Sequence, residues 1–190
     1  MRKLLAISAT LAACLTFGLA PAFATGIAGS KHDLSAAGYG STELCIFCHT
    51  PHAAKASASG PLWNHAASSA TYTIYVFASG THTIGQPGPA SASCLSCHDG
   101  TVGIEAYGSA NTTTHLMTGD ALIGTDLTND HPIGVVFPTT GSSYKSTHTT
   151  PLYNGKVECA SCHAVHDNTN PPFLRMANGG SALCLDCHSK

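Results

Sequence analysis

Eight cysteines of this 190-residue sequence stand in four copies of one pattern, C-x-x-C followed directly by histidine. Such pairs support three kinds of chemistry: a disulfide, a structural zinc site, or covalent attachment of a c-type haem through two thioethers. In the third case the adjacent histidine is an axial ligand of the haem iron. The copies are Cys45-Ile46-Phe47-Cys48-His49, Cys94-Leu95-Ser96-Cys97-His98, Cys159-Ala160-Ser161-Cys162-His163 and Cys184-Leu185-Asp186-Cys187-His188.

The histidine after each pair decides between these chemistries. Histidine occupies 12 of 190 positions, so its chance occurrence after all four pairs has a probability of (12/190) to the fourth power, about 2 in 100,000. Neither a disulfide nor a zinc knuckle requires it. On one helical turn, both thiols can face the vinyl groups of one porphyrin while the next residue points its imidazole at the iron. We therefore expect four covalent haem c groups, attached to Cys45, Cys48, Cys94, Cys97, Cys159, Cys162, Cys184 and Cys187, with His49, His98, His163 and His188 as proximal ligands.

Each iron needs a second axial ligand, and the sequence contains more histidines than the four irons require. Eight histidines lie outside the motifs, whereas only Met117 and Met176 could serve as methionine ligands once a leader is removed. Bis-histidine coordination of all four irons is the simplest assignment. Two neutral imidazoles favour a lower reduction potential than a histidine and methionine pair.

Sequence context separates the distal candidates. Two histidines stand three residues past a proximal one, His52 after His49 and His166 after His163. Because such a pair on one turn cannot share an iron, each would ligate a neighbouring haem and draw the haems together. Two others stand beside apolar residues that could wall a porphyrin. The predicted distal ligands are therefore His52, His65, His131 and His166, with His32 as a fifth candidate, ahead of His82, His115 and His148, which all adjoin threonine.

The first 24 residues read as a secretory signal peptide. Arg2 and Lys3 form its positive end, Leu4–Leu19 is apolar, and Ala22-Phe23-Ala24 supplies the small residues of a cleavage site. The apolar run is about 16 residues, short of the ~20 needed for a membrane span. Lipidation at Cys14 is the alternative form of processing. We expect an exported protein, in the periplasm or at the extracellular or outer surface, without a transmembrane span.

The mature chain would be one domain with little room for an apolar core. Residues 25–190 keep 6 Lys+Arg against 10 Asp+Glu, a net charge of −4, which argues against nucleic-acid binding. About 41 residues remain for each haem. We expect a tetrahaem cytochrome c domain over 25–190, with 154–190 as a paired-motif subunit because the last two motifs stand closest together.

The expected fold is mostly irregular, with short helices at the haem motifs, little β structure and the haem stack as the core. Thr71–Phe77 alternates polar and β-favouring residues and could be a strand, as could Ile133–Phe137. Neither predicts a large sheet. A few apolar residues would cover the macrocycles, among them Leu62, Trp63, Val135 and Phe137.

The motifs together resemble the multihaem c-type cytochromes of metal-reducing bacteria. Cys45 to His52, Trp63-Asn64-His65 and Asn129-Asp130-His131-Pro132 look like the exported tetrahaem branch, some members of which polymerise into extracellular cytochrome filaments. The resemblance implies that the haems stack continuously and that a histidine of one subunit ligates a haem of the next. By that analogy, His52 or His32 would be the intersubunit ligand. The implied partners are redox proteins and further copies of the chain, joined head to tail.

Electron transfer is therefore the expected activity, and the sequence does not predict an enzyme. A multihaem reductase, the enzymatic alternative, needs an iron with an open position, and here histidines exceed the demand. A zinc or disulfide scaffold is a third class, which a colourless mature protein would indicate. Within electron transfer, a filament subunit and a monomeric periplasmic shuttle are both compatible with the residues.

Overall fold

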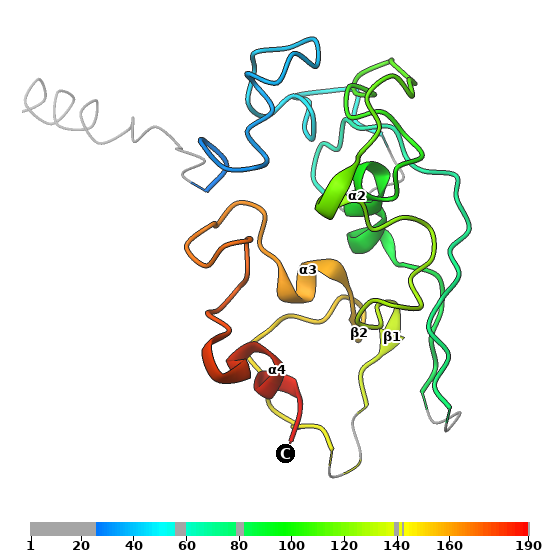
Figure 1. Ribbon diagram of the computed structural model, residues 1–190, viewed down its shortest axis with the longest axis vertical. Helices are drawn as coiled ribbons and strands as arrows, with labels where there is room; N and C mark the ends of the chain where they lie inside the picture. Colours follow the sequence, from blue (N-terminus) through cyan, green and yellow to red (C-terminus); the bar gives the residue numbers. More distant parts are fainter. Residues whose placement is uncertain (1–25, 56–59, 79–81, 139–140, 142, 190) are drawn as a thin grey trace, which may run out of the picture.

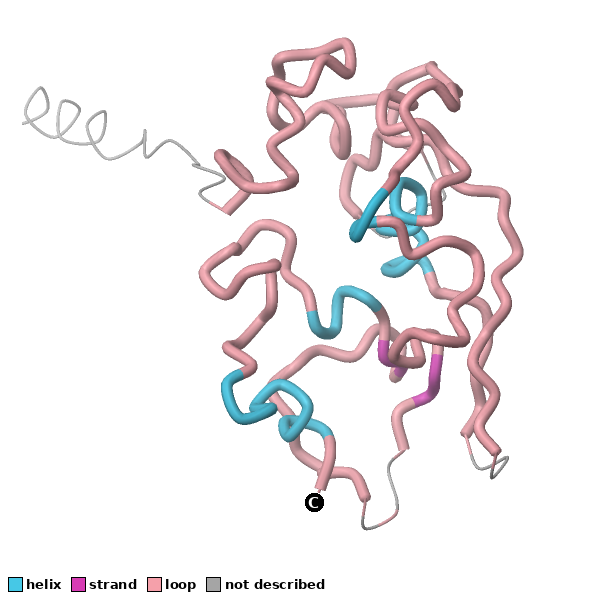
Figure 2. Tube along the Cα trace, viewed as in Figure 1, coloured by secondary structure: helices cyan, strands magenta, loops and turns pink. Residues whose placement is uncertain are grey.

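A computed structural model describes residues 26–55, 60–78, 82–138, 141 and 143–189. The predicted signal peptide lies outside the described residues. Loops and turns make up most of the chain, with a few short helices and a small sheet, as Figure 2 shows. The predicted loop-rich fold is confirmed. The helices are α2 (Pro89–His98), α3 (Cys159–Cys162), α4 (Ala182–Cys187), η1 (Gly119–Ala121) and η2 (Gly179–Ser181), and the strands are β1 (Val135–Val136) and β2 (Lys156–Val157).

Each haem motif forms a single helical turn, as the sequence predicts. The second, third and fourth motifs lie in α2, α3 and α4, which follow one another down the molecule in Figure 1. The first motif is a turn in which the His49 amide donates to the Cys45 carbonyl over 2.8 Å. The same bond from His163 to Cys159 measures 3.1 Å. One turn is sufficient, because it brings the two cysteines and the histidine of each motif to one side.

The β structure is a two-stranded antiparallel sheet. β1 pairs with β2, with Val135 opposite Val157, so the predicted strand at Ile133–Phe137 is confirmed in its centre. Thr71–Phe77 is not a strand: its one ladder contact is an isolated bridge at Thr73. The side-chain amide of Gln86 accepts from the Tyr72 amide and donates to the Tyr72 carbonyl, both over 2.9 Å. These bonds occupy the backbone groups that a partner strand would use.

The interior of the described chain holds few large apolar side chains. The largest side chains below 2% exposure are Leu95, His65, Glu158, Ser91 and Ser96, of which all but the leucine are polar. Of the four residues expected to cover the haems, Val135 and Phe137 are buried and Trp63 is half-buried, whereas Leu62 is 50% exposed. Among the described helices, none is long and apolar enough to cross a membrane.

Candidate haem-binding site

Three proximal imidazoles make the same kind of contact: Nδ1 of each lies beside a backbone carbonyl outside its own motif. A carbonyl oxygen only accepts, so Nδ1 carries the hydrogen in each contact and the lone pair lies on Nε2. This is the tautomer that binds a metal through Nε2, and a bond of this kind orients the ring and raises ligand basicity. The contacts join Nδ1 of His49 to the Pro61 carbonyl over 2.9 Å, His98 to Ala121 over 2.7 Å, and His163 to Pro172 over 3.0 Å.

Three pairs of imidazole rings, called the facing pairs below, have the centroid separation that a shared metal requires. A metal–imidazole bond is about 2 Å long, so two rings on opposite sides of one metal have centroids about 6 Å apart. Each pair joins one proximal histidine to one predicted distal histidine. The centroids are 5.9 Å apart for His49 and His166, 6.0 Å for His98 and His32, and 6.3 Å for His188 and His131. The donor set therefore fits bis-histidine haem coordination.

His32 lies among the rings of three motif-associated histidines. Its ring is 4.6 Å from that of Phe173, with an angle of 15° between the planes. Burial, and to a lesser extent the neighbouring His98, His163 and His166, lower the pKa of His32 to about 4. His32 is therefore neutral at pH 7, which is the form that can ligate a metal.

The proximal histidine of the third motif has no such partner. Among the twelve histidines, all of which the structure describes, none faces the exposed His163 ring at the 6 Å separation seen in the other motifs. His52, predicted as a distal ligand, is exposed and likewise lies outside the three facing pairs. The described chain therefore presents three such imidazole pairs and leaves the exposed His163 and His52 outside them.

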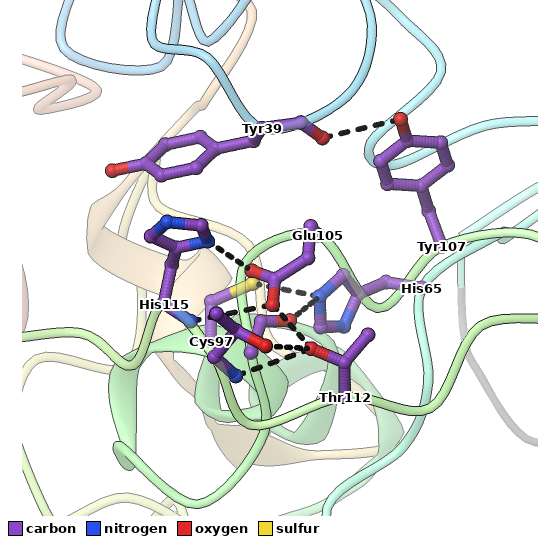
Figure 3. Close-up of polar contacts among 9 residues, drawn as sticks. Tyr39, His65, Cys97, Glu105, Tyr107, Thr112 and His115 are labelled. Carbon is purple, nitrogen blue, oxygen red and sulfur yellow. Dashed lines mark hydrogen bonds and ion pairs between the residues drawn. The ribbon is translucent and has the colours of Figure 1, made fainter.

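His65, the remaining predicted distal ligand, is bound to the protein instead. It is 1% exposed, and its Nδ1 lies 2.9 Å from the Ala66 carbonyl and its Nε2 3.0 Å from the Gly103 carbonyl. Nε2 is also 3.4 Å from Sγ of Cys97, as Figure 3 shows. Burial lowers the pKa of His65, so the ring is neutral at pH 7 and its single N–H donates to one of these two carbonyls. His65 thus lies beside Cys97, a predicted attachment cysteine. Its ring does not lie opposite a proximal imidazole.

The three weaker candidates also have protein partners. His82 Nε2 is 3.3 Å from the Tyr144 hydroxyl, and His148 Nδ1 is 2.7 Å from the Thr150 carbonyl. His115 is exposed and pairs with Glu105 over 3.2 Å (Figure 3). None of the three occurs in a facing pair with a motif histidine at about 6 Å within the described residues.

Cysteines of neighbouring motifs lie close enough to influence one another's pKa, in the order of the sequence. The pKa of Cys97 in the second motif is raised first by burial and then by Cys48 of the first motif. The pKa of Cys94 is raised chiefly by the neighbouring Cys159 of the third motif. The thiol of Cys162 in turn has a raised pKa because of burial and both cysteines of the fourth motif. The attachment points therefore form one row, from the first motif to the fourth.

Asp186, inside the fourth motif, ties α4 to the loop before it. Its carboxylate accepts from the backbone amides and the hydroxyls of both Thr149 and Thr150, over 2.8 to 3.0 Å. Burial raises the pKa of Asp186, but the four donors outweigh it and hold the pKa at about 2. These bonds fix the loop on the side of α4 that carries Cys187.

We expect Asp186→Asn to destabilise the folded protein by about 1 kcal/mol at neutral pH, because the donors of Thr149 and of the buried Thr150 lose a charged acceptor. Since the folded pKa lies below the ordinary 3.8, the wild-type contribution is present above about pH 4 and is lost as the pH falls toward 2. Denaturant unfolding between pH 7 and pH 2 measures both effects. Ser146→Ala, at an exposed position of the same loop, is the control. If the free energy of unfolding of Asp186→Asn equals that of wild type at every pH, the prediction is wrong.

Comparison with known families finds similarity in the last part of the chain. The family model described as the doubled CXXCH motif matches residues 150–190, which contain the third and fourth motifs. No curated protein matches the chain. The match supports a c-type cytochrome with more than one haem, and therefore covalently bound haem c and electron transfer as the kind of function.

Proposed function

We propose that this protein transfers electrons through four covalently bound c-type haems, each with two histidine ligands, and carries electrons outward in respiration as a subunit of an extracellular cytochrome filament. The observation that carries the proposal is the repeated imidazole geometry, in which three proximal rings each face a second histidine at 5.9 to 6.3 Å. The doubled-motif match of residues 150–190 supports the same chemistry.

The chain's own residues act by holding and orienting. The haems, when bound, supply one-electron exchange between ferric and ferrous iron. Two cysteines on one turn would hold each macrocycle. In the first three motifs, the carbonyl bonded to Nδ1 of the proximal histidine would orient the ring for the iron. The row of attachment cysteines favours a relay in motif order, with adjacent haems in close contact. The relay makes or breaks no substrate bond, and we propose that the protein is not an enzyme.

Within the subunit, we assign three distal ligands from the facing pairs. His166 would complete the first haem, His32 the second and His131 the fourth, opposite His49, His98 and His188. His166 follows the third motif yet would ligate the first haem. This agrees with the prediction that the second histidine of a C-H-x-x-H segment ligates a haem other than that of its own motif. Such crossed ligation ties distant parts of the chain together through iron.

The third haem is the place where a second copy would contribute. His163 and His52 are both exposed, and neither belongs to a facing pair. If His52 of one copy ligates the iron at His163 of the next, the two surfaces differ and the contact does not close on itself. Repetition of such a heterologous contact produces an open helical assembly. A net charge of −4 over residues 25–190 opposes this assembly only weakly before the haem propionates are counted.

The same observation defines two alternatives. A monomeric shuttle would leave the third iron with His163 alone, and an iron with an open position is what a multihaem reductase needs. Carbon monoxide binding by the reduced protein discriminates, because only an iron with an open position takes it readily. We expect no binding by the assembled protein.

Electron microscopy of the purified native protein in negative stain tests the proposal. The absorption spectrum and the mass of the mature chain first establish the number of haems and the removal of residues 1–24. Filaments with four low-spin haems per subunit are the expected result. Discrete particles with three low-spin haems and one high-spin haem would favour the shuttle, and a colourless protein would overturn the haem assignment itself.

A further inference from the structure

Glu158 is a buried carboxylate placed between the second and third haem motifs. It is 2% exposed and directly precedes Cys159. Its Oε1 accepts from the Gly88 amide, at the start of α2, over 3.1 Å, and its Oε2 accepts from the Ser91 hydroxyl. The Ser161 amide of α3 donates to the same carboxylate, which completes a capping box. One side chain therefore joins the helix of the second motif to the helix of the third.

All these donors are neutral, and the bonding pattern favours the ionised form. Backbone amides only donate, so both carboxylate oxygens act as acceptors, which stabilises the anion. Within the described part of the chain, Glu158 takes part in no ion pair; the pair found there joins His115 to Glu105. A buried anion without a cation is costly unless other charges compensate it. The protein chain described here therefore satisfies the hydrogen bonds of Glu158 but leaves its charge without a counter-charge.

Two contacts connect this charge to the haem attachment points. Ser91, whose hydroxyl donates to Glu158, accepts from the Cys159 amide over 2.9 Å. Cys159 and Cys94, the predicted attachment cysteines of the two motifs, lie close enough to shift each other's pKa. The pKa of the Cys159 thiol is lowered, chiefly by the contact with Cys94. The charge of Glu158 acts in the opposite direction, so the field of Glu158 reaches the atom that would carry the third haem.

We propose that the carboxylate of Glu158 is the counter-charge of the second and third haems and lowers the reduction potentials of both. A bis-histidine ferric haem has a positively charged centre, which becomes neutral on reduction. A fixed negative charge beside it in a low-dielectric interior stabilises the oxidised state, so reduction requires a more negative potential. Glu158 would thus keep the two central members of the relay from trapping electrons. This inference rests on the proposed function, since it requires haems at both motifs.

Glu158→Gln removes the charge while keeping the length of the side chain. In a potentiometric titration of the assembled protein, followed by NMR signals assigned to each haem, we expect the second and third haems to shift to more positive potentials. The first and fourth should shift much less. Asp126→Asn is the matched control, because Asp126 also accepts from a hydroxyl and an amide, those of Thr128, but is fully exposed. It should leave all four potentials unchanged.

The outcomes separate this inference from the proposed function. If Glu158→Gln carries four low-spin haems and all four potentials match wild type, or all shift equally, the inference fails while the function stands. If the wild-type protein carries no haem at the second or third motif, the function fails first. Should Glu158→Gln not mature, Gly88→Ala provides a second test, because an added Cβ would lie 2.5 Å from Oε1 and displace the carboxylate. Unchanged potentials of the second and third haems in that variant would overturn the inference.

Discussion

His52→Ala is expected to leave four covalent haems in each chain but to abolish assembly into filaments. The substitution touches no cysteine, so attachment proceeds as in wild type. It removes the exposed imidazole that we assign to the third haem of the next copy, and the iron at His163 becomes five-coordinate. We expect discrete particles in negative stain, one high-spin haem of the four in the electron paramagnetic resonance spectrum, and carbon monoxide binding on reduction.

His115→Ala is the matched control for this experiment, since His115 is also exposed but bonds to Glu105. It should assemble and remain fully low-spin. An unaltered filament from His52→Ala would disprove the intersubunit role of His52. Loss of filaments without a high-spin signal would mean that His52 stabilises the contact by packing and that the third haem obtains its ligand elsewhere.

His131→Ala and His65→Ala should have different effects, although sequence context predicts both residues as distal ligands. The His131 ring faces His188 at 6.3 Å, and its Nδ1 lies 3.1 Å from the Pro132 carbonyl, the same kind of contact that holds the proximal rings. Its loss should convert the fourth haem to high spin. His65 lies between two carbonyls, beside Cys97, and its single N–H donates to one of them. Its loss should keep four low-spin haems and lower the free energy of unfolding by about 1–3 kcal/mol, since a buried carbonyl loses its donor.

Spin state by electron paramagnetic resonance and stability by denaturant titration measure the two results in parallel. A high-spin haem in His65→Ala would show that the ring turns toward an iron in the loaded protein. A fully low-spin His131→Ala would remove His131 from the ligand set and direct attention to His148, which lies near Asp186 and Cys187.

The carbonyl partners of the proximal histidines were beyond sequence reasoning. Every residue type has the same backbone carbonyl, whatever its side chain. The residue types of Pro61, Ala121 and Pro172 therefore do not mark them as partners. In each case the contact spans nine or more positions and depends on how a loop returns to the motif. Glu158 gave a weak local signal, as the residue before a helix, but its bonds to Gly88 and Ser91 cross 67 to 70 positions.

The sequence alone predicts the covalent chemistry. A C-x-x-C-H motif needs only one turn of backbone, and the hydrogen bonds that form such a turn are local, so the attachment cysteines and proximal histidines follow from spacing. The loop-rich fold follows likewise from a short chain with few large apolar residues. The tertiary structure alone decided which spare histidine faces which motif, that His65 is engaged by carbonyls, and that Glu158 lies between two haem sites. Those relations join residues far apart in the chain, and their distances depend on how the loops pack, which local spacing does not encode.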